Sequence, residues 1–66
     1  MKFNKRLEET LMWKGITQKE FAEMLGIGRT TVCMWIQGTN KPNLEMFYRI
    51  CIILKESADY MLGLEN

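Results

Sequence analysis

The sequence predicts an all-α fold in which one small domain, residues 1–66, is built from five short helices. Apolar residues recur at helical spacing in successive segments, and glycines with a single proline separate these segments. No two alternating apolar segments are joined by a hairpin turn, so nothing favours a sheet. A chain of this length is expected to form one domain, because a second core would have too little apolar material.

The first helix is predicted from an apolar face near the amino-terminal end. Phe3, Leu7 and Leu11 recur every four residues, which places them on one side of a helix. Gly15 is the expected end, since glycine adopts the left-handed conformation that closes many helices.

The second helix is predicted to begin with a capping box, the T-Q-K-E sequence that starts at Thr17. The Thr17 hydroxyl can accept from the Glu20 amide while the Glu20 carboxylate accepts from the Thr17 amide. The helix should extend to about Leu25 and end at Gly26. Its expected buried residues are Phe21, Ala22 and Leu25.

The third helix is expected from Arg29 to about Gln37, with Gly28 before it and Gly38 after it. Val32 and Trp35 supply its buried face. The Gly26-Ile27-Gly28 connection is short, so the second and third helices should meet at a steep angle. This arrangement is a helix-turn-helix.

The fourth helix should begin after Lys41-Pro42-Asn43, where the proline imposes an extended entry and Asn43 caps the helix. Its expected buried side consists of Leu44, Phe47, Ile50, Cys51 and Leu54. The ICIIL segment within it has strand propensity, but it continues the helical period, which favours a helix. Ser57 then caps a short fifth helix that Gly63 ends.

These elements carry a pattern that resembles the XRE family, the lambda-repressor-like, Cro-type helix-turn-helix proteins. The matching residues are T-Q at 17–18, F-A at 21–22, L-G-I at 25–27, Val32, Trp35, Gly38 and Pro42, followed by S-A-D-Y-M-L-G at 57–63. The resemblance covers the chain from about Leu7 to Gly63. It implies five helices, the third lying in the DNA major groove, and a dimer bound to a palindromic site.

A helical wheel separates the core residues of the third helix from its outward residues. At about 100° per residue, Trp35 and Ile36 fall within about 60° of Val32. Thr30, Cys33, Met34 and Gln37 fall on the other side, so Cys33 and Met34 are expected to be exposed apolar residues. Arg29 and Thr31 lie in the first turn, which reaches base edges in related motifs.

The expected base-contacting residues are Arg29, Thr30, Thr31 and Met34. Arg29 can donate two hydrogen bonds to a guanine, although a phosphate contact is an equal alternative. The threonines can bond a base or a phosphate, and Met34 can lie against a thymine methyl. The resemblance also implies base contacts at Arg29, Thr30 and Met34.

Phosphate contacts are expected at the start of the second helix, at Thr17 and Gln18, where helix amino termini commonly hold DNA phosphates. The resemblance implies a second set of phosphate contacts at the end of the third helix and in the following loop. The residues that match this second backbone clamp of the family are Gln37, Thr39, Asn40 and Lys41. Gln18 alternatively serves as an ordinary first-turn residue, and Asn40 alternatively as a turn residue.

Two positions depart together from the family pattern. Many relatives carry Arg at the position of Leu11 and Glu at that of Ile36, as an ion pair between the first and third helices. Losing one partner would strand a charge at a cost of about 3–5 kcal/mol, whereas replacing both with apolar residues is often neutral. We therefore expect Leu11 and Ile36 to form a contacting apolar pair.

Composition excludes several other classes of protein. There is no histidine and no Cys-x-x-Cys spacing, and no base is in view beside either cysteine. These absences argue against a zinc site, a disulfide framework, a cofactor and an enzyme acting on a small-molecule substrate. No apolar run approaches a membrane span and no signal peptide is evident, so a soluble cytoplasmic protein is expected.

Charge is distributed unevenly although the net charge is only +1. Residues 1–41 hold seven basic and four acidic side chains, whereas residues 42–66 hold two basic and four acidic. A basic half suits a DNA-facing end.

The sequence therefore predicts a sequence-specific binder of double-stranded DNA, a transcriptional regulator and specifically a repressor of phage or mobile-element type. The alternative is a protein-interaction module such as an antitoxin subunit, which the exposed Cys33 and Met34 would support. A homodimer is expected, with Tyr60, Met61 and Leu64 at its interface. The alternative is that these three residues cover the core of one chain.

Overall fold

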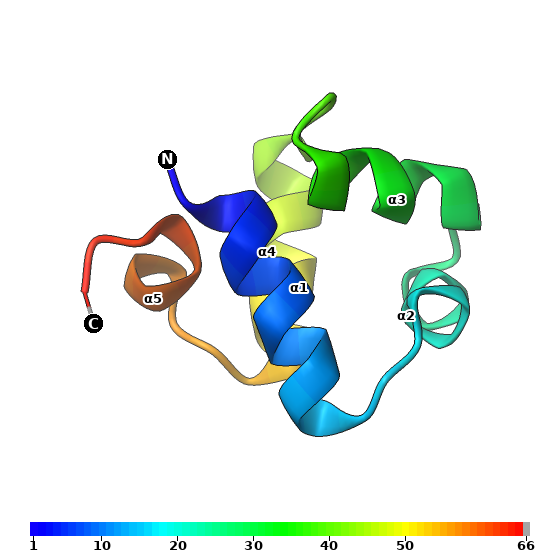
Figure 1. Cartoon of the computed structure of the whole chain (residues 1–66), viewed down its shortest axis with the longest axis horizontal. Coiled ribbons are helices and arrows are strands. Elements are labelled where there is room, and N and C mark those ends of the chain that lie inside the picture. Colours follow the sequence, from blue (N-terminus) through cyan, green and yellow to red (C-terminus); the bar gives the residue numbers. More distant parts are fainter. Residues whose placement is uncertain (66) are drawn as a thin grey trace.

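The computed structural model describes residues 1–65 and confirms the all-α prediction, including the helical assignment of the ICIIL segment. Figure 1 shows five helices in chain order: α1 (Phe3–Lys14), α2 (Gln18–Leu25), α3 (Arg29–Gln37), α4 (Leu44–Leu54) and α5 (Ala58–Leu62). Within residues 1–65, none of these helices has the length and apolar character needed to cross a membrane.

The helix boundaries follow the predicted capping residues. Gly15, Gly26, Gly38 and Gly63 each adopt a left-handed conformation directly after a helix, with φ between 67° and 80°. Asn43 and Ser57 each accept a hydrogen bond from the third residue of the helix that follows. These bonds satisfy amides that have no acceptor inside the helix.

The end of α4 is a boundary that the sequence did not indicate. Lys55 closes this helix in the left-handed conformation, with φ 57°, and its amide donates to the Ile52 carbonyl at 3.3 Å. A side chain with a Cβ adopts this conformation only at a cost, so a glycine is the usual choice.

The core lies between α1 and α4, with α2 and α3 on one side and α5 on the other (Figure 1). Its buried apolar side chains are Phe3, Leu7, Leu11, Phe21, Ala22, Leu25, Val32, Trp35, Ile50, Leu54 and Met61. The predicted buried residues of α1, α2 and α3 are all among them. Thr10 is the buried polar residue, and its hydroxyl lies 3.9 Å from the Met61 sulfur.

Leu44 corrects the predicted buried face of α4, because its side chain is 83% exposed. Leu44 is the first residue of the helix, and at about 100° per residue it lies roughly 80° from the direction of Leu54, which is buried. Phe47 and Cys51 are half-buried and Ile50 is buried, as the pattern predicts for that side.

Candidate nucleic-acid interface

The turn between α2 and α3 fixes the second helix against the third. Gly26 has φ 72°, and the following Ile27 amide donates to the Ala22 carbonyl at 3.0 Å. Ala22 is 2% exposed where these two helices pack together, so a larger side chain would push them apart. Val32 and Trp35 are buried beneath α3, which leaves its opposite face toward solvent.

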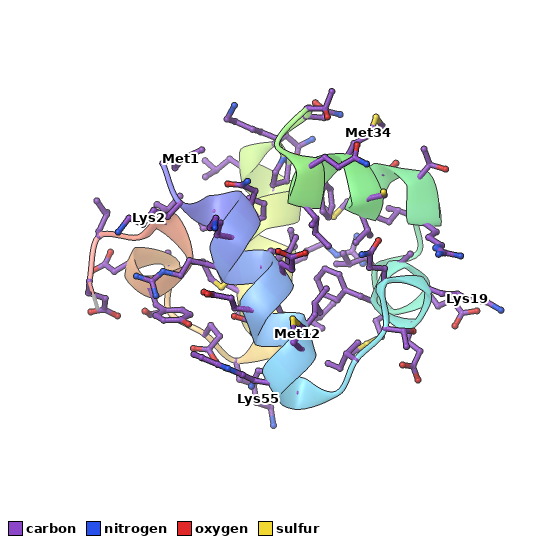
Figure 2. The ribbon with its side chains drawn as sticks, viewed as in Figure 1. Met1, Lys2, Met12, Lys19, Met34 and Lys55 are labelled. Atoms are coloured by element: carbon purple, nitrogen blue, oxygen red, sulfur yellow. The ribbon has the colours of Figure 1, made fainter. Side chains whose placement is uncertain are left out.

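The four predicted base-contacting residues of α3 are all at least partly accessible to solvent. Arg29 and Thr30 are exposed in the first turn, and Thr31 and Met34 are half-buried. Figure 2 shows the Met34 side chain projecting from the outer edge of α3. Cys33 is half-buried as well, so the prediction of two fully exposed apolar residues is wrong. On this short helix neighbouring side chains cover much of each other.

The amino terminus of α2 is the first predicted phosphate site. The Thr17 hydroxyl accepts from the Glu20 amide at 3.0 Å, and the Glu20 carboxylate accepts from the Thr17 amide at 2.9 Å. These bonds confirm the capping box, and the hydrogen bonds from Thr17, the backbone one first, lower the pKa of Glu20 below its usual 4.5. Gln18 is half-buried beside the capping box. The capping box occupies the Glu20 amide and leaves the Gln18 and Lys19 amides without an acceptor inside the helix, so these two can donate to an anion.

The loop after α3 is the second predicted phosphate site. Gln37, Thr39, Asn40 and Lys41 are all exposed. The Thr39 amide donates to the Met34 carbonyl at 3.0 Å, and the Asn40 Oδ1 accepts from the Lys41 amide at 3.0 Å. The second bond engages the side-chain oxygen of Asn40. The NH₂ group of the same side chain has no hydrogen-bond partner within residues 1–65 and can donate to a ligand.

Leu11 and Ile36 lie around the same hollow, which is about 230 Å³ and is bounded also by Thr17 and Gln18. Leu11 is 3% exposed, and Ile36 is half-buried against the core. The first phosphate site therefore adjoins the carboxyl-terminal half of α3. Both side chains occupy the place predicted for the apolar pair, whose direct contact stays a prediction.

Arg49 supports this scaffold although nothing in the sequence pattern pointed to it. Its Nη2 donates to the Leu25 carbonyl at 3.0 Å, so α4 holds the last turn of α2. A carbonyl at a helix end has no partner within its own helix, and a cation is a favourable donor there.

The three residues predicted for a dimer interface have different environments. Leu64 is 74% exposed, whereas Tyr60 is half-buried with the Arg6 guanidinium 4.5 Å from its ring centre. Met61 is fully buried against Thr10, which corrects its assignment to an interface. The fifth helix has only five residues, and Met61 is the one that it buries in the core.

Comparison with known proteins gives one family and two curated relatives. A family model described as Helix-turn-helix matches residues 7–61. The chain is 32% identical over 66 residues, its whole length, to the HTH-type transcriptional activator BcrR of Enterococcus faecalis, covering 32% of that protein. It is 33% identical over 63 residues, 96% of its length, to the HTH-type transcriptional regulator ImmR of Bacillus subtilis (strain 168), covering 50% of that protein.

The chain thus spans half or less of the length of these two relatives. No solved structure matches it significantly.

Proposed function

Because the chain belongs to the helix-turn-helix family of XRE type, a family of transcription regulators and not of enzymes, we propose that it binds double-stranded DNA sequence-specifically through α3. The observation that carries the proposal is the division of α3 into two faces. Val32 and Trp35 fix the helix to the core, while Arg29 and Thr30 stand exposed at its first turn. A helix held in this way can present its first turn to base edges in the major groove.

The polar side chains at α2 and after α3 support a separate role in gripping the backbone. Gln18 lies at the start of α2, and Thr39, Asn40 and Lys41 follow the end of α3. Contacts of this kind position a protein on DNA without reading sequence. The proposal thus assigns Arg29 and its neighbours to specificity and the remaining polar residues to affinity.

Substitution separates these two roles. Arg29→Ala should cost about 1–3 kcal/mol and relax the preference at one base position, because it removes a bidentate contact with guanine. Gln18→Ala and Lys41→Ala should weaken binding to every duplex alike. Fluorescence anisotropy on a preferred duplex and its single-base variants measures both effects. An Arg29→Ala variant that weakens all duplexes equally would reduce Arg29 to a phosphate contact.

Dimerisation on a palindromic operator is the next part of the proposal. Figure 1 shows α5 on the side of α1 away from α2 and α3. A contact between two copies through Leu64 and the half-buried Tyr60 would therefore leave both α3 helices outermost. The domain is 29 Å along its longest axis, a size that suits half-sites about 34 Å apart.

We also propose that the chain represses transcription, as a regulator of phage or mobile-element type. Repression requires only that the protein occupy its operator. We expect it to act in the cytoplasm, where thiols such as Cys33 and Cys51 stay reduced. One relative is named an activator, so both signs occur among similar proteins. A reporter promoter carrying the preferred site should lose transcription when the chain is expressed, and a gain in transcription would refute repression.

The alternative function, a protein-interaction module, is supported by a different surface from the one predicted. Leu44, Tyr48 and Ile52 form an apolar ridge along α4 and are 83%, 63% and 60% exposed. Ridges of this kind can mark interaction sites. Binding that persists unchanged at high salt would favour this alternative, because DNA binding falls steeply with salt.

A further inference from the structure

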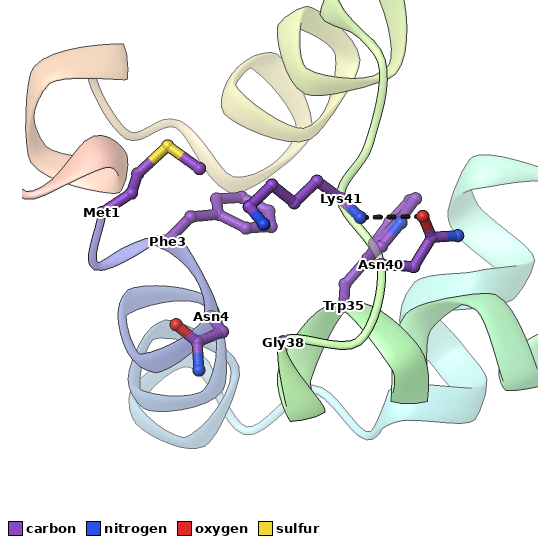
Figure 3. Close-up of a pocket in the computed structure, with 7 residues that line it drawn as sticks. All are labelled: Met1, Phe3, Asn4, Trp35, Gly38, Asn40 and Lys41. Carbon is purple, nitrogen blue, oxygen red and sulfur yellow. Dashed lines mark hydrogen bonds between the residues drawn. The ribbon is translucent and has the colours of Figure 1, made fainter.

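The amino-terminal end of α1 and the loop after α3 enclose a hollow of about 290 Å³ (Figure 3). Asn4 lies on one side of it, Asn40 and Lys41 lie on the other, and Trp35 is part of its wall. Asn4 and Trp35 belong to neither of the phosphate sites described above. The hollow adjoins the second of those sites through Asn40 and Lys41.

Several of the side chains around this hollow can donate hydrogen bonds. Asn4 and Asn40 each carry an NH₂ group, and the Asn40 oxygen accepts from the Lys41 amide. Lys41 supplies an ammonium group, and no acidic residue lines the hollow. A space lined by donors, with one cation and no carboxylate, suits an anion.

Trp35 adds an observation that is independent of the loop. Its side chain is 3% exposed, and within residues 1–65 its indole N–H makes no hydrogen bond to the protein. This nitrogen is not among the buried polar atoms that lack a partner, so it is accessible to solvent at the wall of the hollow. A ligand bound in the hollow can replace water as the acceptor of this N–H.

Gly38 and Asn4 lie next to each other at the hollow. A Cβ on Gly38 would be in ordinary contact with the Asn4 Nδ2, at 3.5 Å, which places the asparagine amide beside the loop after α3. The first residues of α1 also have no side-chain cap, so the amides of its first turn are further donors at this end of the helix.

We infer that this hollow binds a backbone phosphate of DNA, with Asn4 and the Trp35 indole as contacts in addition to Asn40 and Lys41. The inference rests on the proposed DNA binding and extends the second phosphate site across to α1. Asn4 and Trp35 would then contribute to affinity for every DNA sequence alike.

The two tryptophans allow a direct test by NMR on the ¹⁵N-labelled chain. The Trp35 indole N–H should shift on addition of duplex DNA, whereas that of Trp13, 72% exposed near the other end of α1, should not. A parallel titration with inorganic phosphate at constant ionic strength tests free phosphate as the ligand. A shift with DNA alone assigns the hollow to the nucleic-acid backbone. No selective change at Trp35 in either titration would overturn the inference.

Substitution of Asn4 tests the same site by affinity. Asn4→Leu should weaken binding about tenfold for all duplexes, because a hydrogen bond to a charged group is lost. Asn4→Asp keeps the shape, adds a negative charge and should weaken binding further. Asn43→Asp is the matched control, since aspartate caps a helix as well as asparagine and this residue lies outside the hollow. It should lose less affinity than Asn4→Asp.

The results separate this inference from the proposed function. If the chain binds duplex DNA and Asn4→Leu and Asn4→Asp bind as tightly as the unmodified chain, the function stands and the hollow is not a phosphate site. If the unmodified chain binds no duplex at all, the proposed function fails and the inference fails with it.

Discussion

Introducing an ion pair between α1 and α3 at Leu11 and Ile36 would test the interpretation of these two residues as a contacting apolar pair. Leu11 is 3% exposed, so Leu11→Arg alone buries a guanidinium without a partner. The expected cost is about 3–5 kcal/mol. A domain of this size has a total stability of roughly 3–10 kcal/mol at about 0.05–0.15 kcal/mol per residue. The single variant should therefore lose about a third or more of the total stability.

Ile36→Glu alone should lower the free energy of unfolding by less, about 1–3 kcal/mol. Position 36 is half-buried, so the carboxylate of the introduced glutamate keeps access to water through the adjoining hollow. The two residues border the same hollow, so the double variant places the guanidinium and the carboxylate within reach of each other. The ion pair in the double variant should then restore part of the stability that each single substitution removes. A coupling free energy of about 1–3 kcal/mol is expected from a double-mutant cycle.

Urea unfolding followed by far-UV circular dichroism measures the four free energies of this cycle. Leu11→Ala with Ile36→Ala provides the matched apolar cycle, which should show coupling of the same sign if the native side chains touch. Additive losses in both cycles would show that Leu11 and Ile36 do not contact each other, and the argument for a paired replacement would fail.

Further outcomes follow from the capping box, the core and the carboxyl-terminal end. Thr17→Ala should lower the free energy of unfolding by about 1 kcal/mol, measured by urea unfolding at neutral pH. Since the Glu20 pKa is lowered in the folded chain, the stability that Glu20 contributes is complete above its ordinary value of 4.5 and is lost as pH falls through the lowered value. An NMR titration should show this pKa moving only part of the way back toward 4.5 in Thr17→Ala, because the larger cause, the Thr17 backbone amide, is kept. An unchanged titration would contradict the contribution of the Thr17 hydroxyl. Met61→Ala should cost about 2–5 kcal/mol by the same unfolding assay, because a fully buried side chain is removed, and a loss below about 1 kcal/mol would place Met61 outside the core. Leu64→Asp should leave stability within about 0.5 kcal/mol and shift sedimentation equilibrium at high micromolar concentration from dimer to monomer; an unchanged mass would remove Leu64 from the interface.

Local signals account for most of the agreement between sequence and structure. Glycines at 15, 26, 38 and 63 and the capping residues at 17, 43 and 57 act within one helical turn, so adjacent residues suffice to predict them. The buried faces of α1, α2 and α3 follow from helical period, because each helix has a partner along its whole length.

The errors concern residues whose environment depends on distant parts of the chain. Leu44 has the right period for the core but lies at an end of α4 that no other helix covers. Met61 was assigned to the surface of a short helix, yet it fills space beside Thr10 of α1. Arg49 and Asn4 were missed because their neighbours, Leu25 and Gly38, lie far away in the sequence.

For the predicted DNA-contacting residues, the expected and observed exposure to solvent agree at some positions and differ at others. Arg29 and Thr30 are exposed, as a base contact requires, and the Asn40 side-chain oxygen accepts from the next amide in the chain, that of Lys41. The wheel gives direction but not the depth of neighbouring side chains, so it overstated the exposure of Cys33 and Met34.

Selection of bound sequences from random duplex DNA at two salt concentrations tests the central proposal most directly. If α3 reads base edges, the same palindromic preference should emerge at both concentrations. Affinity should fall as salt rises, with a slope of log affinity against log salt concentration that is set by the number of phosphates contacted. Loss of the preference in Arg29→Ala at one position of each half-site would identify the base that this residue contacts. Absence of any preferred sequence, or binding that does not change with salt, would contradict the proposal that α3 is a DNA-reading helix.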